Sequence, residues 1–454
     1  MLRHSLEGLN MMNEQDVNAT LFDFLDRSPV PFYAVRNMRE MLDRAGFVCL
    51  NESGHWKLQE KGSYYVTRND SALIAFRIPK RDFTGFQMMA SHCDSPLFRI
   101  KPDAEITVEK RYVKLNVEKY GGAILAPWLD RPLSIAGRVI ARTEEGIETR
   151  FVNIDRDLLV IPNLAIHMNR QVNEGCQFNV QKDLLPLFCE AAADGEAPEG
   201  ALMKLIAGEA GVCPDRILDT DLYLYSRTRA GYVGLNREFI MSARLDDMQC
   251  AFASLLGFLR SDPSDSAAVL CVFDNEEVGS GSKQGAGGTF LQDTLYRIND
   301  GLGRTQEEYL RSLASSFMVS ADNAHSVHPN HPDKADPTNR PFMNRGIVIK
   351  YSCNQKYTTD GVSGAIFRAV CEKADVPFQT FANRSDMIGG STLGNISQSH
   401  VSVNTVDVGL AQLAMHSPCE TAGAKDTAYL AEAARVLFSG SVRNTGEGTY
   451  TLNF

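Results

Sequence analysis

The stretch Val269–Gly279, Val-Leu-Cys-Val-Phe-Asp-Asn-Glu-Glu-Val-Gly, joins a short apolar run to three closely spaced carboxylates. Its first five residues are typical of a strand that is buried on both faces. Asp274, Glu276 and Glu277 follow at the edge of the sheet where open α/β folds bind ligands. Crowded carboxylates repel one another unless a cation offsets their charge, so we expect a metal site here. A solvated acidic loop is the alternative interpretation of this segment alone.

The two adjacent glutamates of this stretch can serve different roles. Successive residues of an extended chain point to opposite sides. One of Glu276 and Glu277 can therefore bind a metal while the other faces a substrate as a general base.

The composition indicates a globular protein of ordinary character. The chain has 454 residues, of which 22% are charged, and a formal net charge of -10. This length favours two domains. The lack of a basic block or an arginine-rich stripe argues against nucleic acid or an anionic membrane as a partner. We therefore expect a small or peptidic substrate.

The sequence also bears on the compartment. No apolar run approaches the ~18 residues of a membrane span, and residues 1–15 lack the apolar core of a signal peptide. The ten cysteines include no C-x-x-C pair, which favours free thiols over disulfides or a zinc ribbon. We therefore expect a cytoplasmic protein.

The middle of the chain differs in pattern from its two ends. Residues 101–234 contain short β-like segments and glycine-rich turns, whereas alternation of strands and helices returns after Leu235. We predict an α/β domain formed by residues 1–100 and 235–454, into which a β-rich domain, residues 101–234, is inserted. The alternative, a continuation of the same sheet, fits this change of pattern less well.

One arrangement recurs along the two outer segments. Residues that can bind metals stand just after an apolar strand or just before a helix, namely His92, Asp246, Glu276, Glu277, Asp322 and His416. Oxygen and nitrogen donors of this kind suit zinc, manganese or cobalt, and there are enough for two ions. Two metals that share a carboxylate can activate a water and polarise a carbonyl. Each residue alone has a simpler explanation, such as helix capping by Asp246.

A second group of histidines has regular spacing. His325, His328 and His331 follow an H-x-x-H-x-x-H pattern that could bind a metal if it were helical. Pro329 and Pro332 interrupt such a helix, so we do not expect a metal site there.

Six motifs occur in a fixed order and are informative together. They are Ser91-His-Cys-Asp-Ser-Pro, Arg244-Leu-Asp-Asp, Asp274-Asn-Glu-Glu-Val-Gly-Ser, Ser320-Ala-Asp-Asn-Ala-His-Ser-Val-His-Pro-Asn, Asn383-Arg-Ser-Asp-Met and Ala414-Met-His-Ser. With these motifs the chain resembles the aspartyl aminopeptidase family of dinuclear zinc metallopeptidases (M18 type) over nearly its whole length.

The resemblance implies a fold and an assembly. It implies a mixed-sheet, phosphorylase/hydrolase-like α/β catalytic domain, interrupted by a β-rich domain that serves dimerisation and assembly. It also implies a tetrahedral homododecamer, and removal of an N-terminal Asp or Glu from peptides by a metal-activated water.

The resemblance further implies a role for each site residue. Two zinc ions, for which manganese or cobalt can substitute, would be bound by five ligands: Asp246 as the bridge, His92 and Asp322 on one ion, and Glu277 and His416 on the other. Glu276 would be the general base, and Asp94 would orient His92 from behind.

Recognition of an acidic side chain requires a fixed positive charge. Lys350 is the first candidate, and an exposed lysine at a strand end is its alternative interpretation. His325 and Tyr357 are nearby in the order of the motifs. The resemblance implies that His167, in the inserted domain, reaches the site of a neighbouring subunit.

Three positions depart from the usual pattern of the family. Cys93 stands where threonine is commoner, Asp247 where asparagine is commoner, and Asn395 where proline usually follows the glycine. Asp247 adds negative charge near the proposed bridging carboxylate. None of the three removes a proposed ligand, so the departures bear on specificity and metal preference.

Two other functions remain compatible with these residues. An aminopeptidase with a preference for neutral N-termini would use the same metal site, because acid selection depends on few side chains. A non-catalytic, metal-stabilised assembly shell would need the ligands but not Glu276.

Overall fold

The computed structural model describes residues 13–192, 200–387 and 389–454. The expectation about a signal peptide in residues 1–15 therefore lies mostly outside the described residues. Contacts divide the chain into two compact units. The larger unit comprises Met1–Asp94, Ala230–Met415 and Glu420–Phe454, and the smaller unit comprises Ser95–Arg229 and His416–Cys419. The role of residues 101–234 in assembly stays a prediction.

The larger unit is built around a mixed sheet of nine strands in the order β1-β2-β3-β13-β4-β14-β18-β16-β17. The strands are β1 (Val48–Leu50), β2 (Ser63–Arg68), β3 (Ala72–Arg77), β4 (Phe86–His92), β13 (Ala267–Phe273), β14 (Phe317–Ala321), β16 (Ile347–Tyr351), β17 (Phe378–Ala382) and β18 (Asn404–Gly409). The three central strands β13, β4 and β14 are parallel, so their carboxyl ends lie at one edge.

The central strands are buried on both faces, as their apolar sequences predict. Every residue of β13 is buried, and its side chains alternate between two separate cores. Leu270 and Val272 pack into one core, while Val269 and Cys271 pack into the other. This alternation follows from the two-residue period of a strand. It places the residue after Phe273 at the edge of a sheet that is covered on both sides, which confirms the α/β class.

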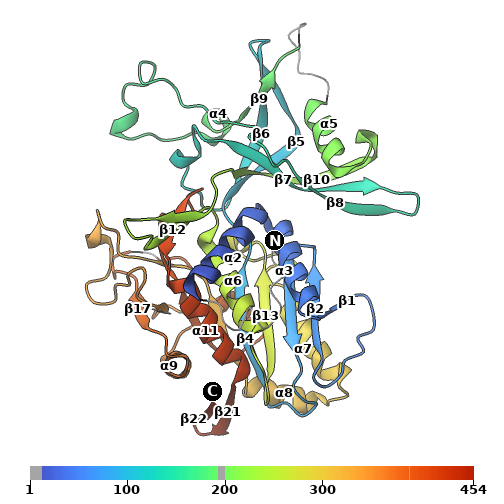
Figure 1. The fold of residues 1–454 in the computed structure, drawn as a ribbon, viewed down its shortest axis with the longest axis vertical. Helices are drawn as coiled ribbons and strands as arrows, with labels where there is room; N and C mark the ends of the chain where they lie inside the picture. Colours follow the sequence, from blue (N-terminus) through green and yellow to red (C-terminus); the bar gives the residue numbers. More distant parts are fainter. Residues whose placement is uncertain (1–12, 193–199, 388) are drawn as a thin grey trace. The chain divides into compact units, whose positions relative to one another are not determined.

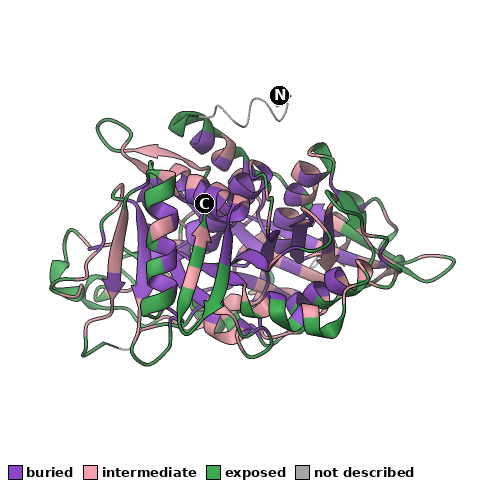
Figure 2. Cartoon of the chain, turned by 90° about the horizontal axis from the view of Figure 1, so that it is seen from below, coloured by how far each residue is buried: buried purple, intermediate pink, exposed green. Residues whose placement is uncertain are grey.

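Helices cover the two faces of this sheet (Figure 1). One face packs against α2 (Glu14–Arg27), α3 (Pro31–Arg44), α6 (Leu245–Leu259), α9 (Gly361–Ala374) and α11 (Asp426–Ser439). The other face packs against α7 (Phe290–Gly301) and α8 (Gln306–Ala314). Figure 2 shows most of the central strands as buried and the outer helix surfaces as exposed. Among the described residues, no helix combines the length and the apolarity that crossing a membrane requires.

The larger unit also contains a second, smaller sheet. Its order is β11-β12-β20-β19-β15, and β15 pairs in parallel with β19 at its edge. The strands are β11 (Gly231–Val233), β12 (Phe239–Ser242), β15 (Ala324–His325), β19 (Ala411–Leu413) and β20 (Glu420–Gly423); the helix α10 (Leu393–Ser397) and the hairpin β21 (Ser441–Gly446) and β22 (Thr449–Asn453) complete the unit.

The smaller unit contains a six-stranded antiparallel sheet in the order β8-β7-β10-β5-β6-β9. Its elements are β5 (Leu97–Val108), β6 (Tyr112–Tyr120), β7 (Leu133–Arg142), β8 (Ile147–Asn153), β9 (Leu187–Glu190), β10 (Ile217–Ser226), α4 (Val180–Asp183) and α5 (Ala201–Ala210). Phe98 packs edge-to-face against the buried Trp128 in its core.

The close approach of α6 to α11 gives a test of the packing. A methyl group on Gly257 would meet the carbonyl oxygen of Ala431 at 2.5 Å and the Cβ of Ala434 at 2.5 Å. Gly257→Ala gains about 1 kcal/mol of helix propensity, but overpacking typically costs about 1–3 kcal/mol. We expect Gly257→Ala to lower the melting temperature of the larger unit, measured by calorimetry.

The matched control is Gly208→Ala in α5, where a Cβ would meet nothing within 4 Å. It should leave the melting temperature unchanged or raise it. If both substitutions raised it equally, the tight contact between α6 and α11 would be contradicted.

Candidate metal centre

Three buried side chains meet at the carboxyl edge of the central sheet. His92 ends β4, Asp246 lies at the start of α6, and Asp322 follows β14. Each offers one nitrogen or oxygen atom, and these atoms lie within 4.8 Å of one another. Strands β4 and β14 are neighbours, so the sheet itself brings His92 and Asp322 together.

Contacts on both ring nitrogens orient the ring of His92. Nδ1 lies 3.1 Å from the backbone oxygen and 3.3 Å from Oδ1 of Asp94, so Nδ1–H donates to Asp94. Nε2 faces Asp246, 3.4 Å from its Oδ1. Burial lowers the pKa of His92, but the contacts with Asp246 and Asp94 outweigh it and raise the pKa well above its ordinary value. A proton on Nε2 and a cation bound there are thus two ways to offset the same negative charge.

Asp94 connects the end of β4 to the acidic turn after β13. Its Oδ1 accepts the backbone N–H of Glu276 and its Oδ2 accepts that of Glu277, each at 3.1 Å. The turn Glu276–Val278 begins after Asn275, whose φ of 61° is in the left-handed region. One buried carboxylate therefore positions the imidazole and both glutamates.

Glu276 and Glu277 are half-buried beside this group. An oxygen of Glu277 lies within 4.8 Å of one of Asp246. Burial raises the pKa of Glu276 to about 7. The positive charge of His92 lowers this pKa, and the negative charge of Asp322 raises it. Burial also raises the pKa of Glu277 well above its ordinary value, with Asp246 adding to the effect.

The donor set fits a divalent metal such as zinc. It combines an imidazole nitrogen with carboxylate oxygens, which are the donors of zinc sites in which sulfur takes no part. Burial raises the pKa of Asp322 to about 6, partly offset by Lys350, and the neighbouring Asp246 raises it further. Burial and the neighbouring negative charges both disfavour the ionised carboxylates, and a bound cation would offset this cost.

Asp246 is more than a helix cap. Its φ and ψ of -80° and 110° are not helical, and its backbone N–H donates to Glu420 at 3.0 Å. Asp247, one of the departures from the family pattern, is fully buried, and its Oδ2 accepts the backbone N–H of His92 at 3.1 Å. It thus holds the end of β4. Cys93 is also buried, and its thiol donates to the backbone oxygen of Ser71.

Lys350 is 3% exposed and is not a lysine of the surface. Its Nζ donates to the backbone oxygen of Asn323 at 2.8 Å and lies 3.9 Å from Oδ2 of Asp322. The ring of Tyr357 is 5.5 Å from Nζ, so the structure brings these two predicted residues together. The role of Lys350 in binding substrate stays a prediction.

Three further predicted residues are His325, His167 and His416. His325 is in the edge strand β15 and contacts the ring of Phe381. His167 is an exposed residue of the smaller unit. His416 follows Met415 directly and is grouped with the smaller unit, in which its Nδ1 lies 3.1 Å from the backbone oxygen of Gly122.

Sequence reasoning missed a buried polar network around Asn323. Its Nδ2 donates to Gln249 at 3.1 Å and to Gln412 at 2.6 Å, and its Oδ1 accepts from the thiol of Cys250 at 2.8 Å. Asn323 follows Asp322 in the chain, so the network fixes the backbone beside a candidate ligand. In the sequence, only the position of Asn323 next to Asp322 indicates a role at the site. The residues that bind Asn323 come from distant segments, so no local pattern reveals them.

Comparisons with known proteins identify the family of the chain. Residues 24–438 match the family model described as "Aminopeptidase I zinc metalloprotease (M18)". The chain is 48% identical over 424 residues to a "Probable M18 family aminopeptidase 2" of Clostridium acetobutylicum, covering 92% of this chain and 98% of the relative.

Two solved structures have the same fold. A chain of the "Cryo-EM structure of the Ape4 and Nbr1 complex" is 36% identical, with a TM-score of 0.90 over 94% of this chain and 86% of that chain. A chain of the "Structure of S. cerevesiae mApe1 dodecamer" is 26% identical, with a TM-score of 0.82 over 94% of this chain and 97% of that chain. The predicted family is confirmed: the chain belongs to the M18 family of aminopeptidases, which are metalloproteases.

Proposed function

We propose that this protein is a zinc-dependent aminopeptidase that releases an N-terminal Asp or Glu from peptides. The observation that carries the proposal is the buried group of His92, Asp246 and Asp322, with Glu276 beside it. Family membership supports the aminopeptidase activity, and the acidic preference is supported by the resemblance of the motifs.

Five residues would hold two ions in this proposal. His92, Asp246 and Asp322 would hold one ion, and Asp246, Glu277 and His416 the other. His416 is one residue beyond Met415 of the larger unit, so the chain keeps it close in sequence to that unit. Zinc, or manganese or cobalt in its place, would supply a Lewis acid that polarises the scissile carbonyl and lowers the pKa of water.

The side chains of the protein would perform the proton transfers. Glu276 would take a proton from the attacking water and deliver it to the leaving amine. Asp94 would keep Glu276 in place by accepting the backbone N–H of Glu276, and it would also hold the ring of His92. The half-buried position of Glu276 leaves it open to substrate on one side.

Lys350 would provide the positive charge that selects an acidic side chain, together with Tyr357 and His325. Asp322 lies 3.9 Å from Nζ of Lys350 and partly neutralises the positive charge of the lysine. A metal bound to Asp322 would take up negative charge of this carboxylate and so leave more of the positive charge of Lys350 for the substrate. His167 would come from a neighbouring subunit.

We further propose a cytoplasmic homo-oligomer, most simply a tetrahedral dodecamer assembled through the smaller unit. The similar chain from the mApe1 dodecamer supports this assembly. Light scattering on purified protein would measure the mass directly, and a monomeric mass would contradict the proposal.

The function is tested with three peptides on zinc-loaded protein, before and after chelation. The peptides begin with Asp, with Leu and with N-acetylated Asp. We expect chelator-sensitive release of Asp alone, because the free amine and the acidic side chain are both required. Release of Leu would favour a neutral preference, and no release from any peptide would favour a non-catalytic shell.

The role of Glu276 is tested by the matched pair Glu276→Gln and Glu277→Gln. We expect Glu276→Gln to keep both metals but to lower kcat about 10²–10⁴-fold, since it removes a general base. Glu277→Gln should instead lower the zinc content, measured by atomic emission. Substantial turnover by Glu276→Gln would rule out its role as the base.

Asp94→Asn tests whether this carboxylate holds the ligands. Asp94 faces three donors, the N–H groups of Glu276, Glu277 and His92, so an amide NH₂ in place of one oxygen would oppose one of them. We expect the zinc affinity to fall about 10–100-fold in a competition assay with a chelator. Asp265→Asn, at the ion pair with Lys80, is the control and should leave the affinity unchanged. Equal affinities in the two variants would contradict the assignment.

A further inference from the structure

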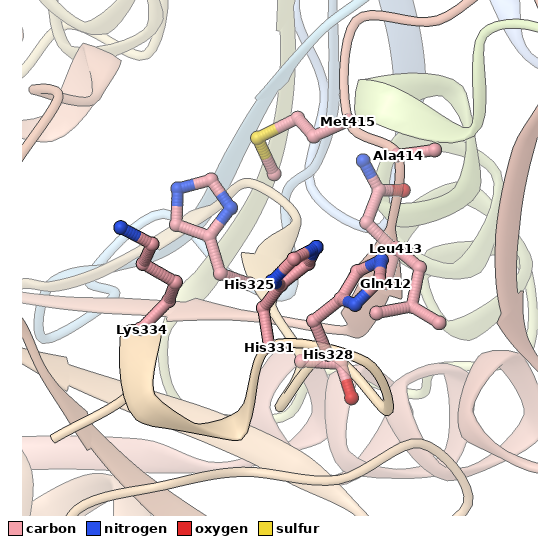
Figure 3. Close-up of a pocket in the computed structure, with 9 residues that line it drawn as sticks. His325, His328, His331, Lys334, Gln412, Leu413, Ala414 and Met415 are labelled. Atoms are coloured by element: carbon pink, nitrogen blue, oxygen red, sulfur yellow. The ribbon is translucent and has the colours of Figure 1, made fainter.

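A cavity of about 340 Å³ opens beside the end of the smaller sheet of the larger unit (Figure 3). We call it the histidine pocket; it is lined by His325, His328, His331, Lys334, Gln412 and Met415, among others. Its volume is in the range of small-ligand sites. None of the described residues that line it carries a carboxylate.

A β-turn brings two of the histidines together. The backbone N–H of His331 donates to the carbonyl of His328 at 3.1 Å, with Pro329 in the second position of the turn, where proline is favoured. The two rings are 5.1 Å apart between centroids. Pro329 was expected to prevent alignment because it breaks a helix, but the turn aligns these rings without one.

The polar groups around the pocket are oriented to donate hydrogen bonds. Nδ1 of His328 accepts the backbone N–H of Asn330 at 3.1 Å, so in the neutral ring Nε2 carries the proton. Gln412 is 1% exposed; its Oε1 accepts from Asn323, and its Nε2 has no hydrogen-bond partner among the described residues. Lys334 adds an ammonium group.

These donors favour an anion over a metal ion. A metal would need the lone pair on Nε2 of His328, which requires the other tautomer and the loss of the bond from Asn330. Lys334 would also repel a cation. The nearby carboxylate of Asp386 is bound by Arg384 through two hydrogen bonds. Arg384 is the main cause that lowers the pKa of Asp386, and the charge of Lys334 adds a smaller lowering effect. Lys334 is therefore available to another carboxylate.

The pocket is joined by the chain to the proposed metal ligands. Met415 directly precedes His416, and His325 is three residues after Asp322. The protein as a whole carries a formal charge of -10, so a pocket lined only by basic and neutral groups stands out from its surroundings. An extended peptide bound at the metal centre has carboxylates at its N-terminal side chain and at its C-terminus.

We infer that the histidine pocket binds a carboxylate of the peptide substrate through Lys334, His331, His328 and Gln412. The inference rests on the proposed aminopeptidase function and extends it with a second anion-binding subsite, distinct from Lys350. Charge-assisted hydrogen bonds to a carboxylate are the strong ones in proteins, and the pocket provides several donors for them.

The test uses Lys334→Met and His331→Leu in the zinc-loaded full chain, with Lys373→Met as the control. Lys373 is an exposed lysine near the end of α9, outside the pocket, so its substitution removes the same charge elsewhere. KM and kcat are measured for tripeptides beginning with Asp or Leu, each as the free acid and as the C-terminal amide. We expect both pocket variants to raise KM about tenfold or more for a peptide with the recognised carboxylate, with kcat little changed.

The peptides identify which carboxylate is bound. If the C-terminal carboxylate is bound, the wild-type protein prefers acids to amides and Lys334→Met removes that preference for both N-terminal residues. If the N-terminal side chain is bound, Lys334→Met weakens only the peptides that begin with Asp. The inference is wrong if neither variant changes any KM more than twofold relative to Lys373→Met.

A binding measurement separates this result from the proposed function. The N-acetylated Asp tripeptide keeps both carboxylates but lacks the free amine, so calorimetric titration with it needs no turnover. Lys334→Met should weaken its binding about tenfold or more, and Lys373→Met should not. Unselective or absent hydrolysis by the wild-type protein would contradict the proposed function, whereas unchanged binding by Lys334→Met would contradict the pocket alone.

Discussion

The mutual repulsion of buried carboxylates at one edge of the central sheet is the constraint on which the site depends. The parallel strands β4, β13 and β14 end at the same edge, and the residues that follow them are acidic or can bind metals. Such a group is stable only if a proton or a cation offsets the charge. Much of the surrounding structure serves this need: Lys350 pairs with Asp322, and Asp94 spreads its charge over the N–H groups of Glu276 and Glu277.

The sequence allowed the fold class and the family to be predicted because the relevant signals are local. The apolar run 269–273 followed by acidic residues indicates the end of a strand, and His92 and Asp322 also follow apolar runs. The resemblance of ordered motifs then linked Asp246 to these residues across the insertion. The grouping of His92, Asp246 and Asp322 in the structure agrees with that expectation, although the metal roles stay predictions.

Other features depend on tertiary contacts that no local pattern contains. The burial of Lys350 follows from the pairing of β16 with β18, and the Asn323 network joins segments that are 73 to 89 residues apart in the chain. Likewise, Pro329 indicated only that a helix was unfavourable between His328 and His331. It did not reveal that a turn places both rings in one pocket, because a turn and an open loop share the same composition.

The position of β4 in the sheet bears on how the protein is made. Its two neighbours, β13 and β14, are residues 267–273 and 317–321, so one edge of β4 stays unpaired until residue 273 has been synthesised and the other until residue 321 has. The main segment of the smaller unit, residues 95–229, leaves the ribosome well before that point and can form its antiparallel sheet first. During synthesis the nascent chain can therefore carry a folded insert while the apolar strand β4 still has an unpaired edge, a state in which aggregation is favoured. Metal binding at the proposed site would have to follow the synthesis of residue 322, because His92 gains both Asp246 and Asp322 only then.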